Sequence, residues 1–430
     1  MNKKILNIAL PSIVSNITVP LLGLVDTAIV GHLGAAAYIG AIAVGGMLFN
    51  MVYWLFGFLR MGTGGMTAQA EGAHDEPECF RILFRALEVA GGLAFLLTLL
   101  QQPILSLAFH FIEATPEVQQ LSILYFDILI WGAPAVLGLY AFLGWFLGRQ
   151  NAKYPMWIAI VQNLVNISTS LFLVLCLGWK VEGVALGTLI AQYSGFFLAF
   201  FLWLKCYYSK NLFRHFSHLW TKGDFRRFFS VNRDIFLRTL CLISVTTYFT
   251  SSGAAQGDVI LAVNALLMQF FVIFSYIMDG FAYAGEAVGG MYYGAHDKAN
   301  FKKFTKSMFK WGVILSGIFT LVYIFGGRPF LDLLTDDIKV REVAQTYFPY
   351  AIAIPFLGFA AFLYDGLFIG ATATRGMLVA VAGASICFFV CKLSLFAYWG
   401  NHALWLSFLL YLFMRGVIQW RYYGRIERKL

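Results

Sequence analysis

The sequence predicts an all-α, polytopic membrane protein of twelve transmembrane helices, arranged as two six-helix bundles related by a parallel repeat. Three observations support this prediction: the composition, the spacing of the apolar stretches, and a sequence repeat at one constant offset. Of the 430 residues, 60% are hydrophobic and only 12% are charged. Because soluble domains carry about 25% charged residues, the composition excludes a soluble globular protein.

The first predicted span, Ile5–Gly34, contains a single acid, Asp26. It exceeds the length of about 20 apolar residues that crosses the hydrocarbon core. A carboxylate there costs roughly 2.5–3.5 kcal/mol, so we expect Asp26 to face protein or water and to handle an ion or a proton. Pro11 and Pro20 each remove a backbone N–H, so this helix can bend. The alternative is a structural hydrogen bond to a neighbouring helix and a static kink.

Hydropathy predicts eleven further spans, which bring the total to twelve. The spans of the first half are 38–66, 84–109, 121–148, 156–178 and 183–205. Those of the second half are 233–254, 258–290, 308–327, 346–371, 376–397 and 401–420.

Lysine and arginine gather in alternate loops between these spans. One side holds the N-terminal lysines, a long basic connection and a basic tail, whereas the other holds only Lys180, Arg328, Lys339 and Arg341. This is the positive-inside pattern, which predicts that both termini lie in the cytoplasm. The net charge of +9 is therefore explained by the loops and does not indicate nucleic acid. We expect a multi-pass protein of the bacterial plasma (inner) membrane.

Two halves of the chain are related by an offset of 222 residues. The tetrapeptide Gly72–Asp75 recurs as Gly294–Asp297, and four further matches at this offset join Gly31 to Gly253, Tyr125-Phe126 to Tyr347-Phe348, Gly144 to Gly366 and Gly148 to Gly370. Six crossings per half give both halves the same orientation, and such parallel repeats are found in one class of secondary transporters.

The repeat divides the chain into four parts. We predict an N-lobe at 1–205, a C-lobe at 233–420 and a basic cytoplasmic tail at 421–430. Between the lobes, residues 206–232 interleave aromatic and basic side chains, which predicts an amphipathic cytoplasmic linker at the membrane interface.

Polar residues inside the predicted spans of the N-lobe follow one helix face. Asn163, Asn166 and Ser170 are spaced i, i+3 and i+7, so they lie on the same side of a helix. Thr188 and Gln192, one turn apart on the next span, could complete the same polar wall. Such a stripe either bonds neighbouring helices together or lines a polar cavity, and the pattern leaves both open.

The repeat isolates the acids, since Asp26 corresponds to Tyr248, and Asp279 and Glu286 correspond to Gly57 and Gly64. Solvation near a helix end is an alternative for Glu286, and Arg60 or Arg238 could pair with one of the acids. The candidates for cavity-lining residues of the C-lobe are Asn264, Asp279, Glu286 and Asp365.

The sequence lacks the motifs of an energy-coupling or hydrolytic site. It has no GxxxxGK[ST] loop and no HExxH motif, and Cys387 and Cys391, which share a helix face, have no histidine or carboxylate close by in the sequence. We therefore expect no enzyme activity, no metal site and no cofactor. Transport would be driven by an ion gradient, because one proton driven by about 150 mV supplies roughly 3.5 kcal/mol.

Six stretches carry a resemblance to a known family: VDTAIVGHLG (25–34), FGFLRMGTGGMTAQAEG (56–72), WGAPAVLGLYAFLGWFLGRQ (131–150), RDIFLRTL (233–240), MDGFAYAGEAVGG (278–290) and YDGLFIGAT (364–372). In this order they resemble the multidrug and toxic compound extrusion (MATE) family, in its DinF-like branch. The resemblance covers nearly the whole chain. It implies two six-helix lobes and efflux of amphipathic, often cationic compounds in exchange for H⁺ or Na⁺.

The resemblance also implies roles for individual residues. Asp26 stands at the family's coupling carboxylate on helix 1, Asn166 at a polar position of helix 5 and Thr188 at a hydroxyl of helix 6. Ser170 departs from the pattern, because many relatives have an aspartate there. Both H⁺ and Na⁺ remain open as coupling ions. Sodium is disfavoured because a hard cation prefers several oxygen ligands and charge compensation, and this lobe offers one carboxylate.

The expected function is therefore a secondary antiporter that exports amphipathic organic compounds by alternating access. Its partners would be a small amphipathic substrate and membrane lipids, and we expect a monomer that binds no nucleic acid. The alternative is a flippase for a lipid-linked cell-envelope intermediate. A flippase would favour a large basic cavity, whereas the spans hold only Arg60, Arg238, Lys392 and Arg415 as bases.

Overall fold

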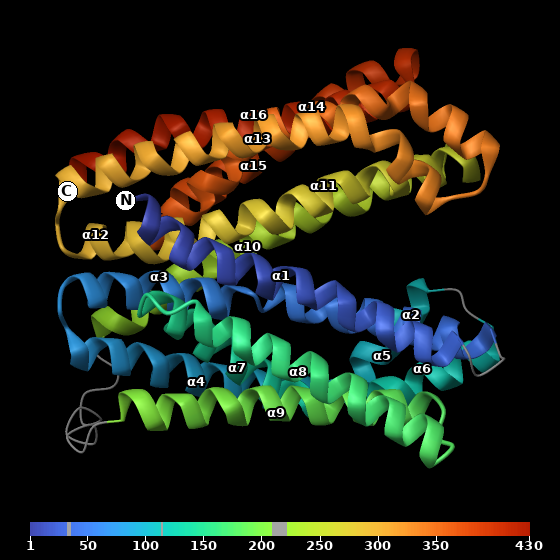
Figure 1. Ribbon diagram of the computed structural model, residues 1–430, viewed down its shortest axis with the longest axis horizontal. Coiled ribbons are helices and arrows are strands. Elements are labelled where there is room, and N and C mark those ends of the chain that lie inside the picture. The colour runs from blue at the N-terminus through green and yellow to red at the C-terminus, as the bar shows by residue number, and fades with distance from the viewer. Residues whose placement is uncertain (32–35, 113–114, 209–221) are drawn as a thin grey trace. The chain divides into compact units, whose positions relative to one another are not determined.

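The computed structural model describes residues 1–31, 36–112, 115–208 and 222–430. These residues are almost entirely helical, and no β-strand occurs among them (Figure 1). Contacts divide the chain into two compact units. We call residues Val14–Phe228 the N-unit, and Met1–Ile13 together with Phe229–Leu430 the C-unit.

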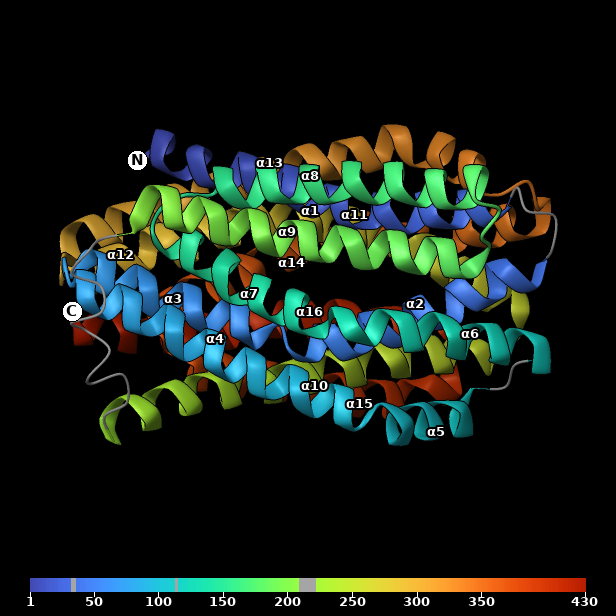
Figure 2. The same cartoon turned by 90° about the horizontal axis from the view of Figure 1, so that it is seen from below.

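Helix α1 (Asn2–Gly31) begins in the C-unit and enters the N-unit at Val14. Two of its helices, α8 and α9, lie side by side in both views (Figures 1 and 2). Its further elements are α2 (Ala36–Leu55), α3 (Phe58–Gly72), α4 (Glu76–Leu99), α5 (Gln101–Phe111), α6 (Pro116–Leu129), the 3-10 turn η1 (Ile130–Gly132), α7 (Ala133–Gly148), α8 (Lys153–Leu171), the π-turn η2 (Phe172–Cys176) and α9 (Val181–Tyr207).

The C-unit is built around α14, which packs against α11, α13 and α16. Its elements are α10 (Lys222–Ala254), α11 (Asp258–Ala284), the π-turn η4 (Gly285–Gly289), α12 (Gly290–Gly294), α13 (Lys298–Leu334), α14 (Ile338–Gly370), α15 (Thr374–Trp399) and α16 (Asn401–Lys429). Both chain termini lie at the end of this unit that carries α12 (Figure 1). There, Lys4 Nζ donates to the Tyr292 hydroxyl over 3.0 Å.

The prediction of an all-helical membrane protein with twelve spans is confirmed. Within the described residues, eleven helical stretches are long and apolar enough to cross a membrane, and α1 adds a helix of 30 residues. The predicted spans coincide with these helices, except that 84–109 runs from α4 across a turn into α5 and 156–178 ends beyond η2. Residues 32–34 of the first predicted span lie outside the described part of the chain. The helices are longer than predicted where their first turns are charged. For example, α13 begins at Lys298, ten residues before the predicted span, because hydropathy does not detect polar helical turns.

The 222-residue repeat is visible in the backbone. Non-glycine residues with positive φ occur at His74 and His296, with φ of 57° and 53°, and at Gln150 and Thr372, with φ of 62° and 47°. Asp75 and Asp297 cap the helices that follow, since each side chain accepts a hydrogen bond from a backbone N–H three residues on. At Asp297, this backbone bond and a bond from the Asn300 side chain lower the pKa of the carboxyl.

The repeat also preserves a close helix contact that requires glycine. A Cβ atom at Gly144 would overlap the carbonyl oxygen of Arg60, and one at Gly366 would overlap the carbonyl oxygen of Ala282. All four positions obey the same offset. Small residues four apart, such as Gly144 and Gly148, allow membrane helices to approach closely. The contact of α7 with α3 is therefore equivalent to the contact of α14 with α11.

Helix α1 contributes to both units. Its residues Ile5, Ile8 and Ala9 are buried, and a Cβ atom at Gly280 of α11 would meet Ile13 and the carbonyl oxygen of Ala9. The predicted N-lobe began at residue 1, whereas the contacts place residues 1–13 in the C-unit. Hydropathy shows that a helix exists but not which neighbours it packs against.

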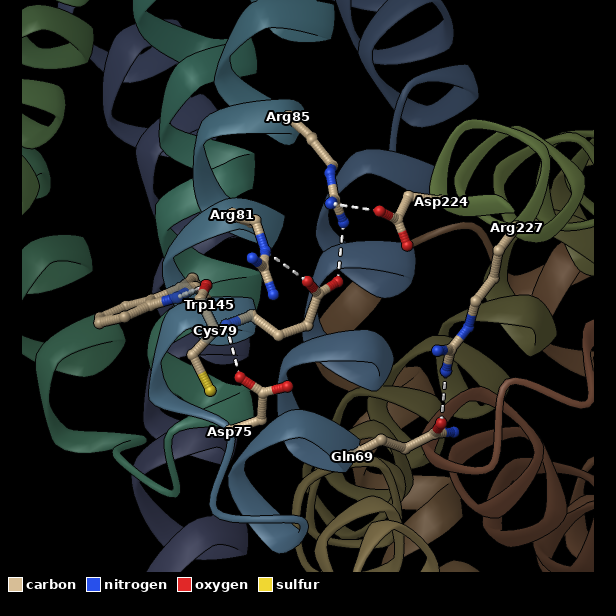
Figure 3. A network of polar contacts seen from close by, with 9 residues as sticks. Gln69, Asp75, Cys79, Arg81, Arg85, Trp145, Asp224 and Arg227 are labelled. Atoms are coloured by element: carbon tan, nitrogen blue, oxygen red, sulfur yellow. Dashed lines mark hydrogen bonds and ion pairs between the residues drawn. The ribbon is translucent and has the colours of Figure 1, made fainter. Parts of the chain in front are cut away.

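Helix α10 is shared in the same way. Its first turns belong to the N-unit, where Asp224 accepts from Arg85 over 2.9 Å and Arg227 donates to Gln69 over 2.6 Å (Figure 3). Arg85 also bonds Glu78 over 2.7 Å. The predicted linker at 206–232 thus ends within α10, while its residues 209–221 lie outside the described part of the chain.

A buried ion cluster ties three helices of the C-unit together. The Asp365 carboxylate of α14 accepts hydrogen bonds from Arg238 of α10, and from Arg415 and Gln419 of α16. The bond from Arg415 measures 2.7 Å, and all four side chains are buried. Of the pairings considered for Arg238, the structure shows the one with Asp365.

We predict that Gly144→Ala and Gly366→Ala each destabilise the protein, by about 1–3 kcal/mol, because the added methyl group overlaps a neighbouring helix. The measurement is thermal unfolding of the detergent-solubilised protein. The matched controls are Gly91→Ala and Gly317→Ala, where a Cβ atom meets nothing within 4 Å, and neither should lower the melting temperature. Equal melting temperatures for tests and controls would contradict the close contact.

We predict that Asp365→Asn destabilises the protein by roughly 3–5 kcal/mol, because it leaves two buried guanidinium groups without their carboxylate. The same unfolding measurement applies. Asp332→Asn is the control, since Asp332 pairs with Arg341 over 3.2 Å at an exposed position and such pairs contribute less than about 1 kcal/mol. A loss no larger than that of the control would show that the cluster is not structural.

Candidate functional site

Asp26 lies inside the N-unit, on the second half of α1, and is only 2% exposed. Val25 and Ile29, which flank it along the helix, belong to an apolar cluster with residues of α2, α6 and α9. Such surroundings disfavour an ionised side chain unless another group stabilises the charge. The carboxylate is therefore held in the environment where protonation or ion binding has the largest energetic effect.

Two neutral side chains form a hydrogen-bond chain to this acid. Thr188 Oγ1 of α9 donates to Asp26 Oδ2 over 3.2 Å. Asn166 Nδ2 of α8 donates to Thr188 Oγ1 over 2.9 Å. A hydroxyl can donate one hydrogen bond and also accept. Thr188 therefore accepts a hydrogen bond from Asn166 and donates its own O–H to the carboxylate.

The helix packing explains why these residues meet. Asn166 and Ser170 are four residues apart on α8, so both point to the same side of the helix. On α9, Gly187 precedes Thr188, and a Cβ atom there would overlap Ser170 Oγ. The missing side chain of Gly187 lets α8 approach α9 closely enough for Asn166 to reach Thr188.

Several oxygen atoms of the site are buried without a hydrogen-bond partner in the described part of the chain. They are Asp26 Oδ1, Asn166 Oδ1 and Ser170 Oγ. Buried polar atoms in proteins are nearly always bonded to protein or to water. The unused acceptors therefore indicate a site that can receive a proton, a water molecule or a cation.

Electrostatically, Asp26 is unusual for a buried acid. Within the described residues, no Lys, Arg or His nitrogen forms an ion pair with it. Nor do the described residues contain a group of three or more His, Cys, Asp and Glu side chains that could hold a metal ion. Protonation of the carboxylate would remove the uncompensated charge.

Two other residues of the predicted polar wall are placed differently. The Asn163 amide donates to the Ala159 carbonyl of its own helix over 2.9 Å. The Gln192 side chain lies against Gly132 of η1. The structure gives neither a hydrogen bond to Asp26 among the residues described. Of the predicted set, Thr188 bonds the acid, and Asn166 is linked to it through Thr188.

The candidates of the C-half lie in the C-unit. Asn264 exchanges amide hydrogen bonds of 2.8 and 2.9 Å with Asn401, and Asp365 belongs to the ion cluster. Glu286 is fully buried in η4, and Asp279 is half-buried on α11. Asn264 and Asp365 are thus engaged by partners within their own unit.

The apolar wall of the site was not predicted. Tyr53 of α2 and Tyr125 of α6 are buried in the cluster that contains Val25 and Ile29. The Tyr53 hydroxyl has no hydrogen-bond partner among the described residues. Aromatic residues are so frequent in this chain that their spacing carries no signal. Only the tertiary structure identifies these two.

Comparison with known proteins places the chain in a family. It matches the sequence profile described as MatE over residues 11–172 and 235–393. It is 38% identical to DNA damage-inducible protein F of Escherichia coli (strain K12), over 97% of this chain and 90% of that protein. It is 25% identical to Protein DETOXIFICATION 44, chloroplastic, of Arabidopsis thaliana, over 85% and 71% of the two chains.

The fold agrees with solved structures of the same kind. A multidrug resistance MATE family transporter of the MOP superfamily, solved in an outward-facing conformation, matches with a TM-score of 0.80 at 17% identity. The match covers 100% of this chain and 97% of that one. The helix order, the 222-residue repeat and the sequence matches lead to one conclusion: the chain belongs to the MATE family of transporters.

Proposed function

We propose that this protein is a secondary antiporter that exports amphipathic, cationic organic compounds in exchange for protons. The observation that carries the proposal is the Asp26 carboxylate, which is buried beside an apolar cluster and whose hydrogen-bond partners among the described residues are neutral side chains. The names of similar proteins concern multidrug resistance and detoxification. They support export of toxic compounds over movement of a lipid-linked intermediate.

In the proposed mechanism, Asp26 carries either a proton or a cationic charge of the substrate, but not both. The ionised carboxylate accepts a hydrogen bond from Thr188 and attracts a cation, since no base of the described residues forms an ion pair with it. A proton on Asp26 removes that attraction and releases the cation. Because one group serves both ligands, export of the compound is coupled to uptake of the proton.

The oxygen atoms of the site favour H⁺ over Na⁺. Sodium is a hard cation and, like other hard cations, prefers several oxygen ligands with compensating charge. Among the described residues the N-unit site has one carboxylate, Asp26, and Ser170 stands where a second acid would add charge. A single buried carboxylate is sufficient for a proton, which needs one acceptor.

We further propose that the protein resides in the bacterial inner membrane with both termini in the cytoplasm. Lysine and arginine are concentrated in the loops on the side of the termini, whereas acids dilute them on the other side. This bias is the usual determinant of orientation. Cysteine labelling of residues in the tail and in the Thr335–Lys339 turn, with a membrane-impermeant reagent, would test it.

We predict that Asp26→Asn abolishes transport driven by a pH gradient, because the amide cannot exchange a proton with the pathway. The measurement is the rate of dye transport across the membrane of proteoliposomes with an imposed pH gradient and no sodium. Ser170→Ala, which leaves the acid in place, should reduce the rate by less than about twofold, since the Ser170 hydroxyl has no hydrogen-bond partner to lose among the described residues.

Thermal unfolding verifies that both variants are folded. Full proton-driven transport in Asp26→Asn would move the coupling site to Asp279, Glu286 or Asp365 and refute the assignment.

We predict that a sodium gradient alone drives no transport by the wild-type protein. The same proteoliposomes are loaded with equal pH on both sides and unequal sodium. A collapse of the pH gradient by a protonophore should stop proton-driven transport in the matched experiment. Transport that follows the sodium gradient and survives the protonophore would establish Na⁺ coupling instead.

We predict that Thr188→Val lowers proton-driven transport by about tenfold, because the hydrogen bond to a charged carboxylate is worth roughly 1.5–3 kcal/mol. Thr188→Ser, which keeps the hydroxyl, should restore most of the rate. Asn163→Ala is the control, because its amide bonds only its own helix among the described residues. Equal rates for Thr188→Val and wild type would remove Thr188 from the site.

A further inference from the structure

The repeat assigns a counterpart to the Asp26 site in the C-unit. At the 222-residue offset, Asp26 corresponds to Tyr248, and Ser170 corresponds to Lys392. These two counterparts are in contact, since Lys392 Nζ of α15 donates to the Tyr248 hydroxyl of α10 over 2.8 Å. The same two helix positions thus carry Asp26 and Ser170 in the N-unit but Tyr248 and Lys392 in the C-unit. The pair contains an acid in the first case and a base in the second.

Lys392 is a buried cation without a carboxylate. It is 9% exposed, and no Asp or Glu oxygen of the described residues lies within ion-pair distance of its amine. The buried arginines of the unit, Arg238 and Arg415, are by contrast both bonded to Asp365. An ionisable residue inside a membrane protein is a candidate for a functional site, and this one is not used to stabilise an acid.

Aromatic rings surround the amine on two sides. Lys392 Nζ lies 4.1 Å from the centre of the Phe396 ring and 4.8 Å from that of Tyr248. Ring faces attract a cation but leave its N–H donors available. An ammonium group has three donors, and the described residues use one of them, for the bond to Tyr248.

The Tyr248 hydroxyl adds a second donor at the same point. Its oxygen accepts the bond from Lys392, and in that role its own proton remains free to donate. An oxyanion placed beside the amine would therefore meet an ammonium N–H and a phenol O–H together. Charge-assisted hydrogen bonds of this kind are the strong ones, and the rings suit the apolar part of an amphipathic molecule.

We propose that Lys392 and Tyr248 form a binding site for the anionic group, a carboxylate, sulfonate or phosphate, of an amphipathic ligand. The site extends the substrates of the proposed antiporter to compounds that carry an acidic group, and in that respect it rests on the proposed function. The anionic group comes from a transported compound or from the headgroup of an acidic lipid, and the experiment separates these two sources.

The test uses purified full-length protein in neutral detergent and two matched probes, a rhodamine with a free carboxylate and its methyl ester. Fluorescence polarisation gives the affinity for each. We expect the wild type to prefer the acid, and Lys392→Gln to weaken binding of the acid by about tenfold, the loss of one charge-assisted bond. Binding of the ester should change by less than about twofold.

Three variants make the result specific. Lys392→Arg, which keeps the charge, should retain the preference for the acid, and Tyr248→Phe should reduce it. Lys310→Gln removes an exposed lysine of the same unit and should have no effect. Unchanged affinity for the acid in Lys392→Gln, or an equal loss in Lys310→Gln, would overturn the proposal. Thermal unfolding verifies that each variant is folded.

The lipid source is tested in nanodiscs of phosphatidylcholine with and without phosphatidylglycerol. If the headgroup is the ligand, phosphatidylglycerol weakens binding of the acid by the wild type but not by Lys392→Gln. If the compound is the ligand, the lipid has no effect and the preference for the acid persists. Either result supports the anion site. Loss of binding with phosphatidylglycerol in both proteins would overturn it.

The outcome is also separable from that of the proposed antiport. The binding assay imposes no pH gradient, so the preference for the acid is measured independently of proton-driven transport. If the wild type shows no proton-driven transport but retains the Lys392-dependent preference, the antiport proposal fails and the anion site stands. If transport is proton-driven and the preference is absent, the anion site fails alone.

Discussion

A charge inside a helix bundle that crosses a membrane has to be stabilised by the protein itself, and this constraint shapes both units. The two units meet it in different ways. Asp26 receives a hydrogen bond from a neutral hydroxyl, whereas Asp365 is held by two arginines. The first arrangement leaves the carboxylate able to bind a proton or a cation, whereas the second holds the carboxylate in an ion cluster. One acid is therefore suited to exchange a ligand and the other to hold helices together.

Much of the fold could be predicted from the sequence, because the length of each apolar stretch and the constant offset between the halves can be read directly from the order of residues. Gly144 and Gly366 were matched from the sequence, and both prove to be points where helices touch. The sharing of α1 and α10 between units could not be predicted in this way. Hydropathy measures how strongly a residue type prefers an apolar environment. It carries no information about which unit provides the neighbouring helices.

Less of the candidate site could be predicted. Residue type and spacing identified Asp26, Asn166, Thr188 and Ser170, because polar residues are rare in apolar spans and therefore stand out. The same criterion could not separate Asn166, which bonds Thr188, from Asn264, whose amide is engaged by Asn401 and Trp405. A polar side chain that joins helices and one that faces a ligand look alike in a sequence, and only their partners distinguish them.

The division of α1 has a consequence for biosynthesis. Residues 1–13 leave the ribosome well before residues 229–430, with which they form one unit. The buried side chains of Ile5, Ile8 and Ala9 cannot reach their final neighbours until α11 has been inserted. Although the two halves share one pattern at the 222-residue offset, a gene that encoded either half alone would specify an incomplete unit, and a segment that is translated early is packed late.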